Sequence, residues 1–246
     1  IKETLIIGAG GRIHVNGGDA APSTVGGAGT PGLGRKAILS AIDGGNGAQG
    51  QLGPGNGAVG IPSGEQPAFS WATMSDVTGG KGGKGGVQVG GISSPSGSVS
   101  WPYSLSHAIS IASLLFTTIG GGNGGGAGGA GSNGDFGGSG GGGAGTLVIF
   151  ARKIIAPTGS LQAIGGAGNV GFSTEGQVGK GGGGGGGGCG GTIYIVTDEI
   201  SIVGICDASG GAGGTVGPDS GDATVGTTGN PGAIIAINPM LGPIAI

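Results

Sequence analysis

Charged residues are scarce in this sequence. Charged residues make up 9% of the 246 residues, whereas soluble domains usually carry roughly 25%. Aromatic residues contribute only 4%. This composition excludes an ordinary globular enzyme as the first interpretation. The net charge is −3 and the few lysines and arginines are scattered, so we predict no nucleic-acid partner.

Long apolar runs are also missing. The longest apolar stretch, residues 108–119, is interrupted by serines and threonines and is shorter than the roughly 20 residues that a spanning helix needs. We therefore predict no membrane insertion. The chain begins at Ile1 without a basic, signal-like segment. We expect it to be a processed form or a fragment of a longer protein.

Cysteine is limited to Cys189 and Cys206. Two cysteines are compatible with one disulfide in an oxidising compartment and, equally, with a pair of unlinked buried thiols. The sequence leaves both interpretations open.

Glycine is what the chain has in excess, with 73 residues. Such a content without a Gly-X-Y period is typical of disorder, but the chain is also 35% hydrophobic, which disordered segments are not. Ordering each residue costs about 1–2 kcal/mol of backbone entropy, and the run 181–188 has no side chains to bury. Backbone hydrogen bonds and close backbone packing must therefore hold the glycine runs.

An internal repeat organises the chain. Residues 145–168 and 191–213 align almost residue for residue, with an offset of 46 that becomes 45 after a single deletion. Each copy reads as two short strands rich in β-branched residues, followed by a glycine-rich excursion. Weaker copies cover residues 4–18, 37–47, 109–124 and 232–238. We predict that the strands at 147–150 and 193–196 are neighbours in one sheet, because such short strands need stacked neighbours.

The glycine excursions predict the second half of the fold. A polyproline-II-like chain suits glycine and makes no internal hydrogen bonds, so neighbouring chains must satisfy its backbone groups. Residues 120–145, 179–191 and 210–232 would then pack side by side. The predicted fold is all-β: a glycine-rich repeat β-solenoid or sandwich with polyglycine II helices packed in layers. It forms a single domain over residues 1–246, with glycine-poor loops inserted at 61–118.

Two glycine-poor stretches, residues 61–78 and 92–118, contain both tryptophans. Aromatic side chains combine a large apolar face with a polar handle and dominate binding hot spots. They are equally compatible with a small satellite core or a contact between protomers. The candidate receptor-binding residues are Phe69, Trp71, Trp101 and Tyr103.

The glycine motifs at 120–129 and 181–191, separated by variable segments, resemble a known family. This family is the glycine-rich distal adhesins of T-even-like phage long tail fibres, whose receptor-binding domain is a layered sandwich of polyglycine II helices. The resemblance implies that the variable segments form tip loops touching host outer-membrane proteins or glycans. By analogy, these loops are residues 61–78 and 92–118. The tryptophan-bearing fibre-attachment region of the family is not evident here.

Other binding motifs are weak. Lys81 and Lys84 lie in a glycine-rich stretch that lacks the serine or threonine that follows the lysine of a phosphate-binding loop. The two histidines, His14 and His107, have no neighbouring ligand at metal spacing. Residues 131–138 resemble a calcium-binding nonapeptide but occur once, and one copy makes no calcium ladder. We predict no cofactor and no metal.

Catalytic constellations are equally weak. Glu65, Asp76, Asp198 and Glu199 supply carboxylates of the kind glycosidases use. However, Asp198 and Glu199 align with Arg152 and Lys153 of the first copy, which indicates a turn between strands. No Ser-His-Asp or Cys-His set is arguable, and we predict no catalytic residue.

These observations predict a non-enzymatic virion tail-fibre or tip adhesin that binds a host cell-surface protein or glycan. Its other partners would be tail-fibre or virion proteins, with a homo-oligomer as a further option, and its location the extracellular virion or otherwise a secreted or cell-surface site. The alternative is a purely structural fibre, sheath, capsid-decoration or surface protein without a receptor. A third possibility is an ice-binding protein, which would need a flat polyglycine II face. Regular surface threonine rows would favour it, and the sequence shows none.

Overall fold

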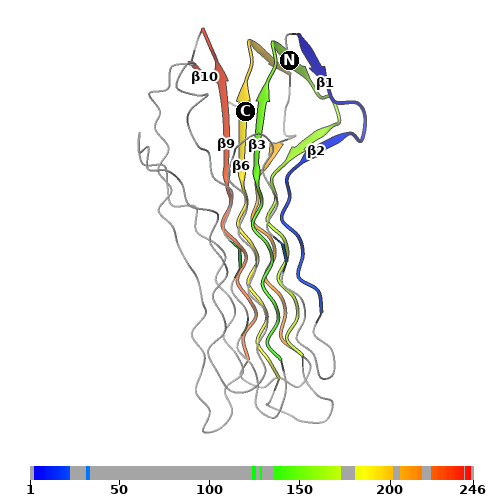
Figure 1. Ribbon diagram of the computed structural model, residues 1–246, viewed down its shortest axis with the longest axis vertical. Helices are drawn as coiled ribbons and strands as arrows, with labels where there is room; N and C mark the ends of the chain where they lie inside the picture. Colours follow the sequence, from blue (N-terminus) through cyan, green and yellow to red (C-terminus); the bar gives the residue numbers. More distant parts are fainter. Residues whose placement is uncertain are drawn as a thin grey trace.

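The computed structural model (Figure 1) describes residues 3–22, 32–33, 124–125, 128, 136–172, 181–201, 206–217, 223–240 and 242–244. These residues contain strands and irregular backbone but no helix, and therefore none that could cross a membrane. The predicted all-β class is confirmed for this part of the chain. The weaker copy at 37–47, most of the copy at 109–124, and the loops at 61–118 lie outside the described residues.

Each complete copy of the repeat contains three short strands, so the predicted pair was one strand too few. A two-residue corner at Ala151 and Arg152 separates the first strand from the second. The first copy forms β3 (Thr146–Phe150), β4 (Lys153–Ile155) and β5 (Ser160–Gln162), and the second forms β6 (Thr192–Val196), β7 (Glu199–Ser201) and β8 (Cys206–Asp207). The partial copies form β1 (Thr4–Ile6), β2 (Arg12–His14) and β9 (Ala233–Asn238), and β10 (Gly242–Ile244) ends the described chain.

Equivalent strands of successive copies pair with each other in three small sheets. The orders are β1-β4-β7, β2-β5-β8 and β10-β9-β6-β3, and every pair is parallel except β9 with β10. Thr146 is the register partner of Thr192, which confirms the predicted pairing of 147–150 with 193–196. Leu161 pairs with Cys206, one residue less in offset, so the deletion falls between β7 and β8. The residues that align in the sequence repeat are therefore the residues that pair in the sheets.

The hydrophobic core lies among these strands and is built from alternate residues, as period-two side-chain geometry requires. Leu147 and Ile149 of β3 and Ile193 and Ile195 of β6 are buried on one face, with Ile154 of β4 completely buried beside them. β-branched residues suit this pleated, close-packed surface.

The glycine segments extend away from the strands as long side-by-side traces (Figure 1). Two layers are defined by their hydrogen bonds. Layer 1 contains residues 15–20, 163–172 and 208–217, which continue from β2, β5 and β8. Layer 2 contains residues 138–145, 181–191 and 223–232, which lead into β3, β6 and β9. One repeat therefore runs through its strands, along layer 1 and back along layer 2.

Segments within a layer run in the same direction, and the two layers run in opposite directions. In layer 2, the amides of Gly138, Gly141 and Ala144 donate to the carbonyls of Gly183, Gly186 and Cys189. In layer 1, the amides of Gly165, Gly168 and Gly171 donate to the carbonyls of Ser209, Ala212 and Thr215. Between layers, the amides of Gly182, Gly185 and Gly188 donate to Phe172, Asn169 and Gly166, in reversed order. Every third amide therefore points at the same neighbouring segment.

The central segment, 181–191, explains the run of eight glycines. Residues 181–190 are all buried, with segments of both layers hydrogen-bonded around them. A Cβ added at Gly184 or Gly187 would lie less than 3.0 Å from backbone atoms of the adjacent segment 208–217. Positive φ is not the reason, because Gly10 (71°) and Gly242 (93°) are the described glycines with left-handed backbone. Glycine is required here because there is no room for a side chain.

Candidate functional site

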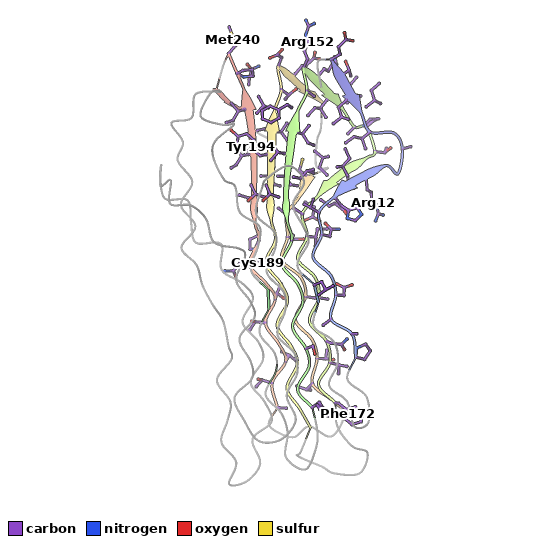
Figure 2. All side chains as sticks on the ribbon, in the orientation of Figure 1. Arg12, Arg152, Phe172, Cys189, Tyr194 and Met240 are labelled. Carbon is purple, nitrogen blue, oxygen red and sulfur yellow. The ribbon has the colours of Figure 1, made fainter. Side chains whose placement is uncertain are left out.

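The predicted receptor-binding residues, Phe69, Trp71, Trp101 and Tyr103, lie outside the described residues. In the sequence, both segments that contain them lie between the described residues 32–33 and 124–125. Figure 2 shows that side chains gather around the strands, near Tyr194 and Arg152, and become sparse along the glycine segments below Cys189. Any side-chain chemistry in the described part is therefore concentrated at the strand end.

Segment 208–217 of layer 1 presents a side chain outward at every third residue. In segment 208–217, Ser209, Ala212 and Thr215 are exposed, while Gly211 and Gly214 between them are buried. The exposed positions of this segment carry small, uncharged side chains. A surface of this kind offers shape and backbone but little chemical variety for recognising a ligand.

Two polar side chains of segment 15–20 replace a backbone neighbour. The Asn16 Oδ1 accepts a hydrogen bond from the Ile164 amide at 2.9 Å, and the Asp19 Oδ1 accepts one from the Ala167 amide at 2.7 Å. The two acceptors and the two amides are each three residues apart, so the side chains follow the periodicity of the layer. They satisfy backbone donors of segment 163–172, the middle segment of layer 1, which makes them structural rather than ligand-binding.

The strand corners are held by a second polar ladder. The Thr197 hydroxyl, 1% exposed, lies within hydrogen-bond distance of the Glu199 carbonyl at 2.9 Å and the Arg152 carbonyl at 3.1 Å, and the Arg152 carbonyl also accepts from the Asp198 amide. The Asn238 side-chain amide donates to the Asp198 carbonyl at 2.9 Å. Each corner is thereby tied to the corner of the preceding copy. The predicted turn at Asp198 is confirmed, whereas Glu199 begins β7.

The exposed face of β4 and β7 carries one ion pair. Lys153 and Glu199 are register partners, and their Nζ and Oε1 atoms are 2.6 Å apart. Both side chains are substantially exposed, so solvent screens the attraction. The sequence alignment matched Glu199 with Lys153, and in the structure the two residues are register partners.

Tyr194 stands out among the buried side chains. It is 1% exposed and packs with Val196, Val148, Ile235 and Ile237 on the face of the β3-β6-β9 sheet opposite the main core. Its hydroxyl, alone among the buried side-chain polar atoms described, makes no hydrogen bond. Loss of hydration raises the pKa of this phenol to about 12. Sequence reasoning did not single out Tyr194, although its position within an apolar strand was the available signal.

The two cysteines are unlinked. Cys189 is buried at the end of the central glycine run, and Cys206 is half-buried on β8 against the core. Burial raises the pKa of the Cys206 thiol to about 11, which disfavours the reactive thiolate. Of the two interpretations that the sequence left open, the structure favours unlinked thiols.

Potential metal ligands do not cluster in the described part of the chain. Within the described ranges, no three His, Cys, Asp or Glu side chains are grouped so that they could hold a metal ion. His14 lies exposed on β2, while His107, Glu65 and Asp76 lie outside the described residues.

Comparisons with family models, curated proteins and solved structures found no match to this chain.

Proposed function

We propose that this chain is a non-enzymatic virion fibre or tip adhesin in which a rigid glycine block carries receptor-binding loops. In this proposal the glycine segments are polyglycine II helices packed in layers, and the repeated strands form a short β-solenoid at one end. The receptor is a protein or glycan of a host cell surface. The binding residues are Phe69, Trp71, Trp101 and Tyr103, within residues 61–78 and 92–118.

The three-residue spacing of the hydrogen bonds carries the scaffold half of this proposal. The amides of Gly138, Gly141 and Ala144 all reach the same neighbouring segment. A β-strand directs alternate residues to one side, whereas a polyproline-II-like chain has three residues per turn and directs every third residue to one side. The dense backbone pairing and the buried glycines support a stiff block, because its segments cannot shift independently.

The adhesive half rests on where side-chain diversity is found. The described glycine layers present few side chains suited to specific recognition, while both tryptophans, together with Phe69 and Tyr103, lie in the inserted segments. Because most of the scaffold is glycine backbone with few side chains, specificity for a receptor must come from such insertions. The resemblance to glycine-rich tail-fibre adhesins supports the same division of roles.

Trp71→Ala and Trp101→Ala test the function, with Met240→Ala as the matched control because Met240 is 86% exposed and lies outside both loops. Melting temperature and adsorption to host cells are measured on the same purified proteins. We expect both tryptophan variants to keep the wild-type melting temperature and lose adsorption, because truncating an exposed anchor removes contact area without opening a cavity. The control should keep both properties.

Two results would count against the proposal. A lower melting temperature, with adsorption falling only in proportion to folded protein, would make the tryptophans core or protomer contacts. Intact folding with unchanged adsorption would favour the purely structural alternative.

A further inference from the structure

Segment 223–232, at one lateral edge of layer 2, differs from the other two segments of that layer. Segment 181–191 receives hydrogen bonds from segment 138–145 and gives hydrogen bonds to segment 223–232. The donor residues of the first two segments are equivalent positions of the repeat, because the β3–β6 register relates them. The β6–β9 register extends the same equivalence to the third segment. The donors are Gly138, Gly141 and Ala144 in the first segment and Gly184, Gly187 and Gly190 in the second.

In the third segment the equivalent positions are Val225, Thr228 and Pro231. Here the glycine pattern stops. Val225 is 58% exposed, and Thr228 and Pro231 are also exposed, so these positions face away from the block. Pro231 has no amide hydrogen and cannot donate to a fourth segment.

The side chains at these positions occupy the space that another backbone would need. A Cβ at Gly184, Gly187 or Gly190 of the preceding segment would lie less than 3.0 Å from the carbonyl oxygens of Gly214, Gly211 and Ala208. By the same register, the side chains of Val225, Thr228 and Pro231 project to where the next glycine segment of layer 1 would lie. These side chains therefore obstruct the addition of another glycine segment to layer 1. The missing amide hydrogen of Pro231 also weakens hydrogen bonding to a further segment of layer 2.

The strands show the same feature at the same edge. β9 pairs in parallel with β6 on one side, but on the other side it is paired by the antiparallel β10. β10 contains Pro243 and is the edge strand of the described sheet on the β9 side, with β3 at the opposite edge. Proline on an edge strand prevents further pairing. The strand sheet and the glycine layer therefore both end at this edge of the molecule.

We propose that residues 223–232, with β10, form a cap that prevents the glycine block from adding a segment of a second copy of this chain. This inference concerns self-association and is independent of receptor binding. A second copy is the relevant occupant because an edge of backbone donors at three-residue spacing is complementary to another glycine segment, and each copy carries several.

Amide hydrogen exchange of the wild-type protein tests the edge directly. Within one segment, Gly226 and Gly229 donate to Gly214 and Gly211, while Val225 and Thr228 occupy the outward donor positions. We expect the amides of Val225 and Thr228 to exchange about 100-fold or more faster than those of Gly226 and Gly229. Equal protection of all four amides would overturn the cap, because it would show that the outward donors are already paired.

The combined variant Val225→Gly, Thr228→Gly and Pro231→Gly tests what the cap prevents. The matched control is Ser209→Gly, Ala212→Gly and Thr215→Gly, which makes the same number of exposed changes at the same spacing on segment 208–217. We expect a concentration-dependent increase in mass over wild type, measured by light scattering, for the edge variant alone. Wild-type mass in both variants, or association of both, would overturn the proposal.

If the combined edge variant does not fold, Pro231→Ala restores one donor while retaining a Cβ. Under the proposal, the new amide at position 231 should exchange as fast as that of Thr228, since none of the described segments lies beyond it to accept its hydrogen bond. Protection of that new amide from exchange would contradict the proposal, because it would show that an acceptor lies beyond segment 223–232.

Discussion

Lys153 on β4 and Glu199 on β7 face each other across the parallel ladder, with 2.6 Å between Nζ and Oε1. The pair repeats the 46-residue register of the strands beneath it, but both side chains are exposed to solvent. An exposed ion pair contributes about 0–1 kcal/mol. We therefore expect Glu199→Gln to lower the free energy of unfolding by less than about 1 kcal/mol, measured by urea titration. A loss of several kcal/mol would show that this pair, rather than the backbone ladder, holds β4 and β7 together.

Substitutions in the central glycine segment should be far more damaging. In Gly184→Val and Gly185→Val, the added side chain would collide with backbone of segments 208–217 and 138–145, which hydrogen bonds fix in place. We expect each to lower the free energy of unfolding by about 3 kcal/mol or more. The control is Ala212→Val, which should melt close to wild type. Ala212 is exposed and lies three residues from both Ser209 and Thr215, which are exposed as well. Equal melting of all three variants would mean that segment 181–191 is not tightly packed.

The unpartnered hydroxyl of Tyr194 should cost stability. Tyr194→Phe removes a buried polar atom that makes no hydrogen bond and keeps the ring that packs against Val196. We expect the free energy of unfolding to stay constant or rise by about 1 kcal/mol. Tyr194→Ala should instead lose about 3–5 kcal/mol, because it leaves a cavity. A clear loss in Tyr194→Phe would reveal a hydrogen bond to the hydroxyl.

Alkaline pH should destabilise the protein through two buried groups. The pKa is raised to about 12 for Tyr194 and to about 11 for Cys206, in both cases by desolvation. Each group resists ionisation in the folded state, so its stabilising contribution is complete below the unfolded pKa and is lost as pH rises. The windows are about pH 10–12 for Tyr194 and about pH 9–11 for Cys206. Tyr194→Phe and Cys206→Ala should each flatten the corresponding part of the stability profile; unchanged profiles would exclude these residues as the cause.

The thiols should behave as unlinked and protected. We expect two alkylated cysteines per chain after unfolding without reductant, since Cys189 and Cys206 are not joined by a disulfide. Under native conditions near pH 8, alkylation should be slow because Cys189 is buried and the pKa of Cys206 is raised to about 11. Mass spectrometry counts the modified thiols. Recovery of an unmodified, oxidised pair from unfolded protein would indicate a disulfide.

The sequence by itself determined the repeat and the register. Because residues 145–168 and 191–213 share one pattern of apolar, β-branched and glycine positions, their strands adopt the same conformation and stack, which places Thr146 beside Thr192. The exclusion of side chains from residues 181–188 likewise follows from composition, since glycine alone tolerates backbone on every side. The burial of residues 181–190 bears this out.

Tertiary structure decided how the segments are arranged around one another. No local pattern fixes that segments run parallel within a layer and antiparallel between layers, or that the side chains of Asn16 and Asp19 substitute for a backbone neighbour. Nor does the strand pattern around Tyr194 reveal that its hydroxyl lacks a partner. These features depend on which chains surround a given residue. A hydrogen bond between segments far apart in sequence forms only when the whole block assembles, so its geometry is a property of the packed layers and not of either segment alone.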